Sequence, residues 1–168
     1  WSGRAKGIFQ IEGSESMTEL VRKYKPESLE DMCSVVSLFR PGITRAIDPE
    51  TGLNMMELFI RKRQGRIPVK YKAVELEPIL KDTYGAFLYQ EQVMKTVASL
   101  ADYTPEEQDK IRKIMGKTKP EEMKQQKEIF LSRVKIDRET AEVIWNEMEK
   151  FGIYAFNRAH GFAYGMIS

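Results

Sequence analysis

The sequence has few of the side chains that most often carry out chemistry in proteins. Its 168 residues include one cysteine, Cys33, and one histidine, His160. A lone cysteine cannot form an internal disulfide, and these two residues cannot supply the four nitrogen or sulfur ligands of a structural zinc site. His160 has no carboxylate nearby in the sequence and Cys33 lies on an apolar helical stripe, so no Ser/His or Cys/His nucleophile is expected.

Long apolar runs are also missing. No segment approaches the ~18 apolar residues needed to cross a bilayer, and no secretory signal is present. We therefore expect a cytoplasmic protein in a reducing setting, without a membrane partner. An apolar content of 42% in 168 residues is enough for the core of one ordinary domain, so a single compact unit is expected.

No Asp-x-Asp pattern occurs on a predicted strand. Polymerases, nucleases and phosphatases generally bring two or three carboxylates together on Mg²⁺. The nearest acidic pairs instead fall in the first turns of predicted helices, where the helix dipole favours negative charge: Glu30 and Asp31, Glu106 and Glu107, and Glu121 and Glu122. We therefore expect no catalytic residue and no metal ligand within this chain.

Positive charge is present in clusters, although the formal net charge is only +2. The first cluster is Arg61, Lys62, Arg63, Arg66, Lys70 and Lys72, and the second is Lys110, Arg112, Lys113, Lys117 and Lys119. Either run alone is typical of a solvated helix face. Together with a third basic and aromatic segment near the C-terminus, they favour an anionic partner.

Helical periodicity dominates the rest of the sequence. It predicts helices from Met17 to before Pro26, and over 29–39, 53–63, 90–100, 105–116, 120–134 and 138–151, with a last one capped by Asn157. Ser28, Thr104 and Asp137 have the side chains expected at helix N-caps, and Gly65 is a predicted helix stop. The segments 43–52 and 66–72 are predicted loops, and 84–89 is the best strand candidate. The predicted fold class is mainly α, with one or two short β-strands.

Two parts of the sequence have the residue types of a nucleotide or nucleic-acid site. Arg112 and Lys113 are adjacent near the end of a predicted helix, where they could hold phosphates. Asn157 and His160 share one face of the last predicted helix, and Tyr154 before it could stack on a base. Cations in a last turn also offset the helix dipole, and the small residues of the last helix could pack on a neighbour, so these structural interpretations stay open.

Six blocks along essentially the whole chain resemble the alpha subunit of bacterial DNA polymerase III, the family C replicative polymerases. Residues 7–12 (GIFQIE) are similar to the family's GIFQLES segment, and 38–42 (LFRPG) to its L-[FY]-R-P-G turn. Residues 61–65 are similar to its RKxG block, and 83–94 (TYGAFLYQEQVM) to TYGxxxYQEQVM. Residues 111–117 (IRKIMGK) are similar to LRRAMGKK, and 149–160 (EKFGIYAFNRAH) to EKFAGYGFNKSH.

The resemblance implies a single fingers-region domain of a DNA-directed DNA polymerase over residues 1–168. Residues 1–16 would connect palm to fingers, and 17–168 would form the helical fingers. The family's three metal-binding aspartates lie in the palm, so Mg²⁺ would be held outside this chain, which alone would be inactive. The implied partners are primer–template DNA, dNTP, the palm and thumb, and the sliding clamp through regions outside this chain, in a bacterial or phage-infected cell.

The resemblance also assigns roles to individual residues. Those implied to bind the incoming dNTP are Arg112, Lys113, Tyr154, Asn157 and His160. Those implied to contact DNA are Arg40, Arg61, Lys62, Lys117 and Arg158. We expect the nucleotide-binding groups to converge on one groove.

The sequence departs from the family pattern at several positions. Lys113 stands where the family has a second arginine, so the charge is kept but the bidentate guanidinium geometry is lost. Ala159 replaces a serine, and Arg158 a lysine. These departures favour a divergent member, and Trp1 at the start with a helical pattern still present at Ser168 indicates a fragment. Two alternatives remain: a non-catalytic helical protein-interaction or DNA-binding module, and a fragment of a damage-tolerant family C paralogue.

Overall fold

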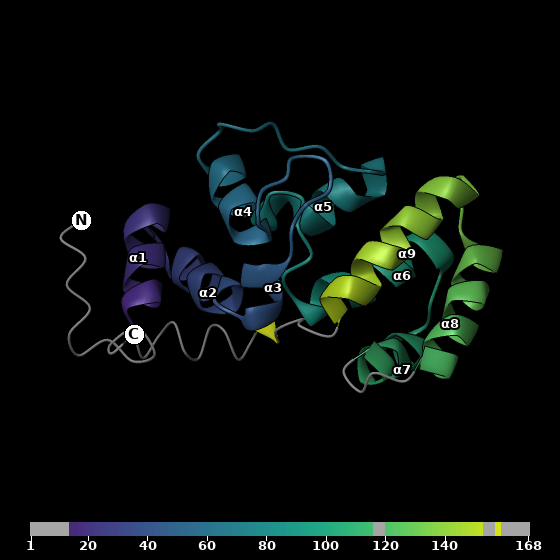
Figure 1. The fold of residues 1–168 in the computed structure, drawn as a ribbon. Helices are drawn as coiled ribbons and strands as arrows, with labels where there is room; N and C mark the ends of the chain where they lie inside the picture. Colours follow the sequence, from purple (N-terminus) through teal and green to yellow (C-terminus); the bar gives the residue numbers. More distant parts are fainter. Residues whose placement is uncertain (1–13, 116–119, 153–156, 159–168) are drawn as a thin grey trace. The chain divides into compact units, whose positions relative to one another are not determined.

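A computed structural model describes residues 14–115, 120–152 and 157–158 of the chain. The fold is mainly α, as the sequence predicts, and Figure 1 shows the helices in order. Their bounds are α1 Glu15–Tyr24, α2 Leu29–Leu38, α3 Pro41–Arg45, α4 Met55–Arg63, α5 Glu77–Leu80, α6 Gln90–Ala101, α7 Pro105–Met115, α8 Pro120–Arg133 and α9 Arg138–Gly152, with the 3₁₀ turns η1 Val74–Leu76 and η2 Lys81–Thr83.

The chain divides into two compact units. The first unit is Trp1–Pro68 with Phe156–Ser168, and the second unit is Val69–Ala155. Helices α1 to α4 therefore belong to the first unit, and η1 to α9 to the second. The expectation of a single fingers-region domain stays a prediction, because two compact units can belong to one domain.

Helices of the first unit begin at capping side chains, of which the sequence predicts Ser28 but not Asn54. The hydroxyl of Ser28 accepts a hydrogen bond from the Asp31 backbone N–H at 3.1 Å, and the Asn54 side chain accepts one from the Glu57 N–H at 2.7 Å. Each of these bonds satisfies a backbone donor that a helix N-terminus leaves unpaired. The apolar faces of α1, α2 and α4 are buried, and the rings of Tyr24 and Phe59 stack at 6.2 Å.

The predicted loop over 43–52 is partly wrong, because Pro41–Arg45 forms the short helix α3. A Pro-Gly pair often marks a turn, but proline also suits the first position of a helix, where its missing N–H costs nothing. Burial of Ile43 then holds the turn against the rest of the unit. The following residues return through an isolated antiparallel bridge between Ile47 and Asn54.

The predicted strand over 84–89 is wrong, and no strand forms within the described parts of the chain. This segment is irregular, with a single bridge residue at Tyr89. The backbone N–H groups of Leu88 and Tyr89 donate to the side-chain oxygen of Gln92, at 2.8 and 2.9 Å, instead of to a neighbouring strand. The short turns η1, α5 and η2 just before it were also not predicted.

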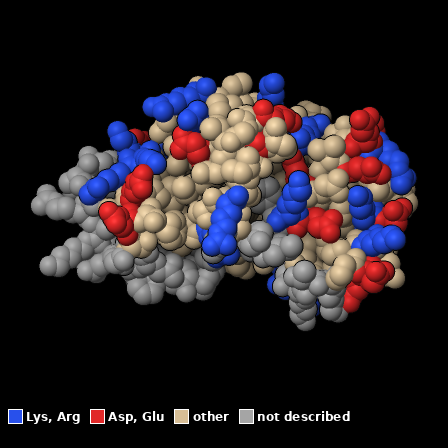
Figure 2. Space-filling model, in the orientation of Figure 1, with Lys and Arg blue, Asp and Glu red and all other residues tan. Residues whose placement is uncertain are grey.

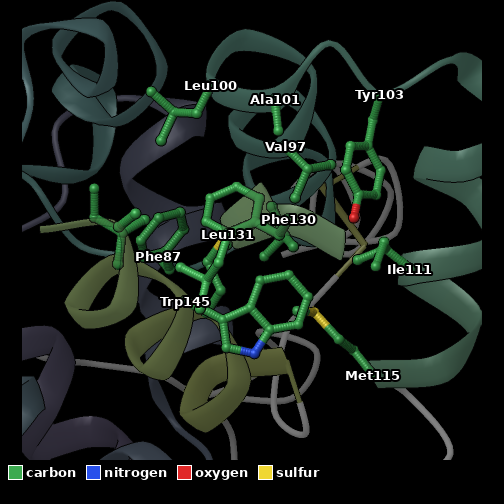
Figure 3. Packing of buried hydrophobic residues seen from close by; sticks show 14 of the residues in the cluster. Phe87, Val97, Leu100, Ala101, Tyr103, Ile111, Met115, Phe130, Leu131 and Trp145 are labelled. Carbon is green, nitrogen blue, oxygen red and sulfur yellow. The ribbon is translucent and has the colours of Figure 1, made fainter. Parts of the chain in front are cut away.

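The core of the second unit is a cluster of apolar side chains from α6, α7, α8 and α9 (Figure 3). Trp145 is fully buried, and its ring lies 5.2 Å from that of Phe130. Ala141, Ile144 and Met148 share this face of α9 by their helical spacing and are also fully buried. Nowhere in the described ranges is a helix long and apolar enough to cross a membrane.

Candidate functional site

Arg112 and Lys113 lie in the last turn of α7 and share one carboxylate. The guanidinium of Arg112 donates to Oδ1 of Asp109 from Nε at 3.0 Å and from Nη2 at 2.7 Å. The ammonium of Lys113 lies 2.5 Å from Oδ2 of the same residue. The bonds from Lys113 and Arg112 hold the pKa of Asp109 below its usual value, against a small opposing effect of burial. Both cations therefore lie beside one another on α7.

Local sequence explains why α7 is firmly held. Thr104 and Glu107 form a reciprocal capping box, because Thr104 N–H donates to the Glu107 carboxylate at 2.9 Å and Glu107 N–H donates to the Thr104 hydroxyl at 3.3 Å. Ile111 and Ile114, which precede and follow the two cations in the sequence, are both buried. The side chains of Arg112 and Lys113 are nevertheless 37% and 60% exposed, so a solvent-borne anion could reach them.

The basic residues of α4 have unequal surroundings. Arg61 pairs with Glu57, with Nε 2.7 Å from a carboxylate oxygen, and both side chains are partly exposed. Lys62 is half-buried, and Arg66 beyond the helix is exposed. Arg40, the N-cap residue of α3, is half-buried, and burial lowers the pKa of its guanidinium. Arg61, Lys62 and Arg66 are thus at least partly exposed, so a polyanion could reach them.

Arg63 has a structural role that the sequence did not reveal. Its guanidinium bonds to both oxygens of Asp31, at 3.1 and 2.7 Å, and donates to the Tyr24 carbonyl at 2.9 Å. It also lies 4.5 Å from the centre of the Tyr24 ring. The Arg63 and Asp31 side chains are only 15% and 14% exposed. Arg63 therefore ties α4 to α1 and α2.

The surroundings of Asp31 shift the pKa of its carboxyl group. Burial by itself raises the pKa of Asp31, but bonds from Arg63, from the Glu27 backbone N–H and from the Tyr24 hydroxyl together outweigh burial and lower it. The net direction is downward, so Asp31 stays ionised opposite Arg63.

The glycine of the RKxG-like block is explained by the end of α4. Gly65 has φ +69°, the left-handed conformation that favours glycine. The Gly65 N–H donates to the Lys62 carbonyl at 3.1 Å and the Arg66 N–H to the Arg61 carbonyl at 2.9 Å, which is a Schellman motif. The predicted helix stop at Gly65 is confirmed.

The block 83–94 is also explained by structure. Gln92 is buried, and its amide nitrogen donates to the Thr83 hydroxyl at 2.7 Å, while its oxygen accepts from two backbone N–H groups. The Thr83 hydroxyl in turn donates to the Ala86 carbonyl at 2.6 Å. Gly85, at φ +83°, passes so close that a Cβ atom there would lie 3.3 Å from the Lys70 carbonyl oxygen. This network fixes the irregular segment in front of α6.

The remaining site residues are divided. Lys117, Tyr154 and His160 lie outside the described residues. Asn157 is exposed and Arg158 half-buried, and both belong to the first unit, whereas Arg112 and Lys113 belong to the second. The expected convergence of the nucleotide-binding groups on one groove therefore stays a prediction.

Several features bear on the chemistry of the described residues. Figure 2 shows acidic side chains beside basic ones on the visible face, in keeping with the surface ion pairs. The predicted acidic pairs do fall in first turns of helices, at the starts of α2, α7 and α8. Among described residues no group of three His, Cys, Asp or Glu could hold a metal ion.

Cys33 is fully buried, and burial, followed by the charge of Glu30, raises the pKa of its thiol.

Comparison with known proteins identifies the family. The family model described as the bacterial DNA polymerase III alpha subunit finger domain matches residues 1–138. The chain belongs to this family. The resemblance stated from the sequence blocks is thereby confirmed.

Curated relatives agree. The DNA polymerase III subunit alpha of Aquifex aeolicus is 41% identical over 170 residues, a match that covers 99% of this chain and 14% of that protein. The subunits of the same name from Pseudomonas aeruginosa and Escherichia coli are 42% and 38% identical, and each match covers 96% of this chain and 14% of the relative. The chain thus spans about one seventh of the length of these relatives.

Proposed function

We propose that this chain, as the fingers portion of a DNA polymerase, grips the triphosphate of the incoming dNTP through Arg112 and Lys113. The observation that supports this most is the pair of partly exposed cations set side by side on one carboxylate at the end of a well-anchored helix. Arginine offers a bidentate donor fork and lysine a compact charge, and both are common phosphate ligands.

Phosphoryl transfer depends mainly on positioning and charge stabilisation. Negative charge is spread over the triphosphate as the bond to the leaving pyrophosphate breaks, and fixed cations stabilise that charge. In this proposal Mg²⁺ would be held by carboxylates in another part of the polymerase, where it would neutralise charge on the phosphates. The present chain contributes cations and binding groups, so by itself it is inactive.

Other residues complete the proposed site. Tyr154, Asn157 and His160 would line the nucleotide and primer-terminus pocket. Contacts with the primer–template would come from Arg40, Arg61, Lys62, Lys117 and Arg158. The enzyme would work in the cytoplasm of a bacterial or phage-infected cell, with the palm, the thumb and a sliding clamp as partners.

Steady-state kinetics of the full-length polymerase test the main claim. Arg112→Ala should lower kcat/KM for dNTP about tenfold or more, because a charge-assisted contact to phosphate is lost. Arg138→Ala is the matched control, because Arg138 is an exposed, ion-paired helix arginine in the same unit. Unchanged kinetics in Arg112→Ala and Lys113→Ala would contradict the proposal.

DNA binding by the 168-residue chain tests the other part. Binding of a primer–template should weaken steeply as salt rises, because contacts between lysine or arginine and phosphate release counterions. Combined alanine substitution of Arg61 and Lys62 should make the slope of log affinity against log salt shallower by about two, because two phosphate contacts are lost. Salt-insensitive binding would contradict the assignment.

A further inference from the structure

We infer that Asp109 is a positioning residue for nucleotide binding, which holds Arg112 and Lys113 in place to receive the triphosphate. This inference rests on the proposed function, because it assigns a role to a neighbour of the two proposed phosphate ligands. Asp109 itself would not bind the nucleotide, since its carboxylate and the phosphates carry the same sign of charge.

The carboxylate divides its two oxygens between the two cations. Oδ1 accepts both bonds from Arg112, at 3.0 and 2.7 Å, and Oδ2 lies 2.5 Å from the Lys113 ammonium. In a simple surface pair the carboxylate contacts a single cation. An example is Glu19 in α1, which contacts Lys23 at 2.8 Å. Spacing along the helix makes the arrangement possible, because Arg112 and Lys113 are three and four residues after Asp109 and lie over the same face.

The bonds to Asp109 leave both cations able to take a second anion. Arg112 uses Nε and Nη2, whereas a guanidinium has five N–H donors, and the ammonium of Lys113 has three. The three side chains are 37%, 60% and 39% exposed, so phosphate oxygens can approach while the carboxylate stays bonded. A triphosphate carries several negative charges, so it can bind beside one carboxylate.

Positioning is worthwhile because both cations have long, flexible side chains. Arginine and lysine each have large rotamer entropy, part of which must be lost when they bind a phosphate. A carboxylate that already restricts both side chains reduces the entropy lost on binding. Removal of Asp109 should therefore weaken ground-state binding of dNTP, even though one negative charge leaves the site.

The experiment uses the full-length polymerase with saturating primer–template and varied dNTP. Asp109→Ala should raise the KM for dNTP about two- to fivefold, the range expected for one exposed ion-pair arrangement, with a smaller change in kcat. Asp109→Glu, which keeps a carboxylate within reach of both cations, should restore most of the loss. Alanine favours helix, so α7 should stay folded, and circular dichroism checks this.

A double-mutant comparison separates positioning from a general structural effect. In a polymerase that carries Arg112→Ala and Lys113→Ala, the further change Asp109→Ala should leave KM unchanged, because Asp109 acts through those two residues. Glu19→Ala, which breaks the exposed pair in α1, is the control that should leave KM unchanged in the wild-type background.

The outcomes are distinct. An unchanged or lowered KM in Asp109→Ala would overturn the inference, and a lowered KM would show that Asp109 acts as a competing counter-ion. The same fold-change in the background without both cations would overturn it too. If Arg112→Ala and Lys113→Ala have normal kinetics, the proposed function itself fails. If those two are impaired and Asp109→Ala is normal, only this inference fails.

Discussion

Two arginines near the ends of helices, one in each unit, have opposite surroundings. Arg63 in the first unit is 15% exposed and bonds to a carboxylate and to a backbone carbonyl of another helix, beside a tyrosine ring. Arg112 in the second unit is 37% exposed and bonds to a carboxylate one turn earlier on its own helix. Similar basic runs in a sequence can therefore hold a fold together or present charge to solvent.

The two units also differ in what holds them. In the first unit an ion pair with 15% and 14% exposure joins three helices. In the second unit α6 to α9 pack around Trp145 and Phe130, and ion pairs stay at the surface. We therefore expect the first unit to be more sensitive than the second to loss of one charged group, and the second unit to depend mainly on apolar volume.

The largest effect should come from the apolar core of the second unit. Trp145→Ala should lower the free energy of unfolding by about 3–5 kcal/mol, because it removes a fully buried ring and leaves a cavity beside Phe130. Val143→Ala, on the exposed side of α9, should change it by less than about 0.5 kcal/mol. Urea denaturation followed by circular dichroism measures both. Equal losses in the two variants would refute the apolar account of this unit.

Loss of Arg63, in the first unit, should cause the next largest decrease in the free energy of unfolding. Arg63→Ala should cost about 2–3 kcal/mol, because it leaves the Asp31 carboxylate largely buried without its partner. Arg63→Lys should recover little, since an ammonium cannot reproduce the paired bonds to both oxygens. Amide hydrogen exchange of α1, α2 and α4 reports the unit directly.

Arg66→Ala is the matched control for Arg63, because Arg66 lies three residues later and is exposed. It should change stability by less than about 0.5 kcal/mol. If Arg63→Ala were as mild as this control, the ion pair would not hold the first unit, and the contrast between the two arginines would disappear.

Two glycines, one in each unit, should show losses of stability of intermediate size when changed to alanine. Gly65→Ala should cost about 1 kcal/mol, since its φ of +69° is strained for alanine but nothing lies within 4 Å of the added Cβ. Gly85→Ala should cost about 2 kcal/mol, because its Cβ would also lie 3.3 Å from the Lys70 carbonyl oxygen and from Val69 Cγ1. Thermal unfolding ranks the two variants, and a reversed rank would show that the close approach is easily relieved.

The smallest effect is a pH dependence of the first unit. The folded pKa of Asp31 lies below its ordinary value of 3.8, so its stabilising contribution is present above that value and is lost as pH falls through the folded pKa. The stability difference between wild type and Asp31→Asn should therefore shrink as the pH falls below about 4. A difference that stays constant as the pH falls below about 4 would mean that the pKa of Asp31 is not lowered by folding.

Local signals in the sequence predicted most of the helices. Thr104, Ser28 and Asp137 were predicted as helix starts, and each side chain accepts a bond from the backbone at the start of its helix. The buried stripe of α9 follows from spacing, because apolar residues three or four apart share a face. Such features depend on neighbours in sequence and can therefore be predicted.

Errors arose where distant contacts decide the structure. The aromatic run before α6 has the composition of a strand. Its backbone N–H groups nevertheless donate to the Gln92 side chain, and Phe87 is buried in the core. Arg63 and Asp31 are 32 residues apart, so no local pattern pairs them. At the candidate site, the adjacency of Arg112 and Lys113 was predictable, whereas their shared bonds to Asp109 were not recognised, although spacings of three and four on a helix could have indicated them.

The contrast between Arg63 and Arg112 is tested most directly by measuring both alanine variants in two assays. The account predicts that Arg63→Ala lowers the unfolding free energy of the 168-residue chain by about 2–3 kcal/mol, while Arg112→Ala changes it by less than about 0.5 kcal/mol. In the full-length polymerase, Arg112→Ala should lower kcat/KM for dNTP about tenfold or more. Destabilisation by Arg112→Ala equal to that of Arg63→Ala, with normal dNTP kinetics, would contradict the account.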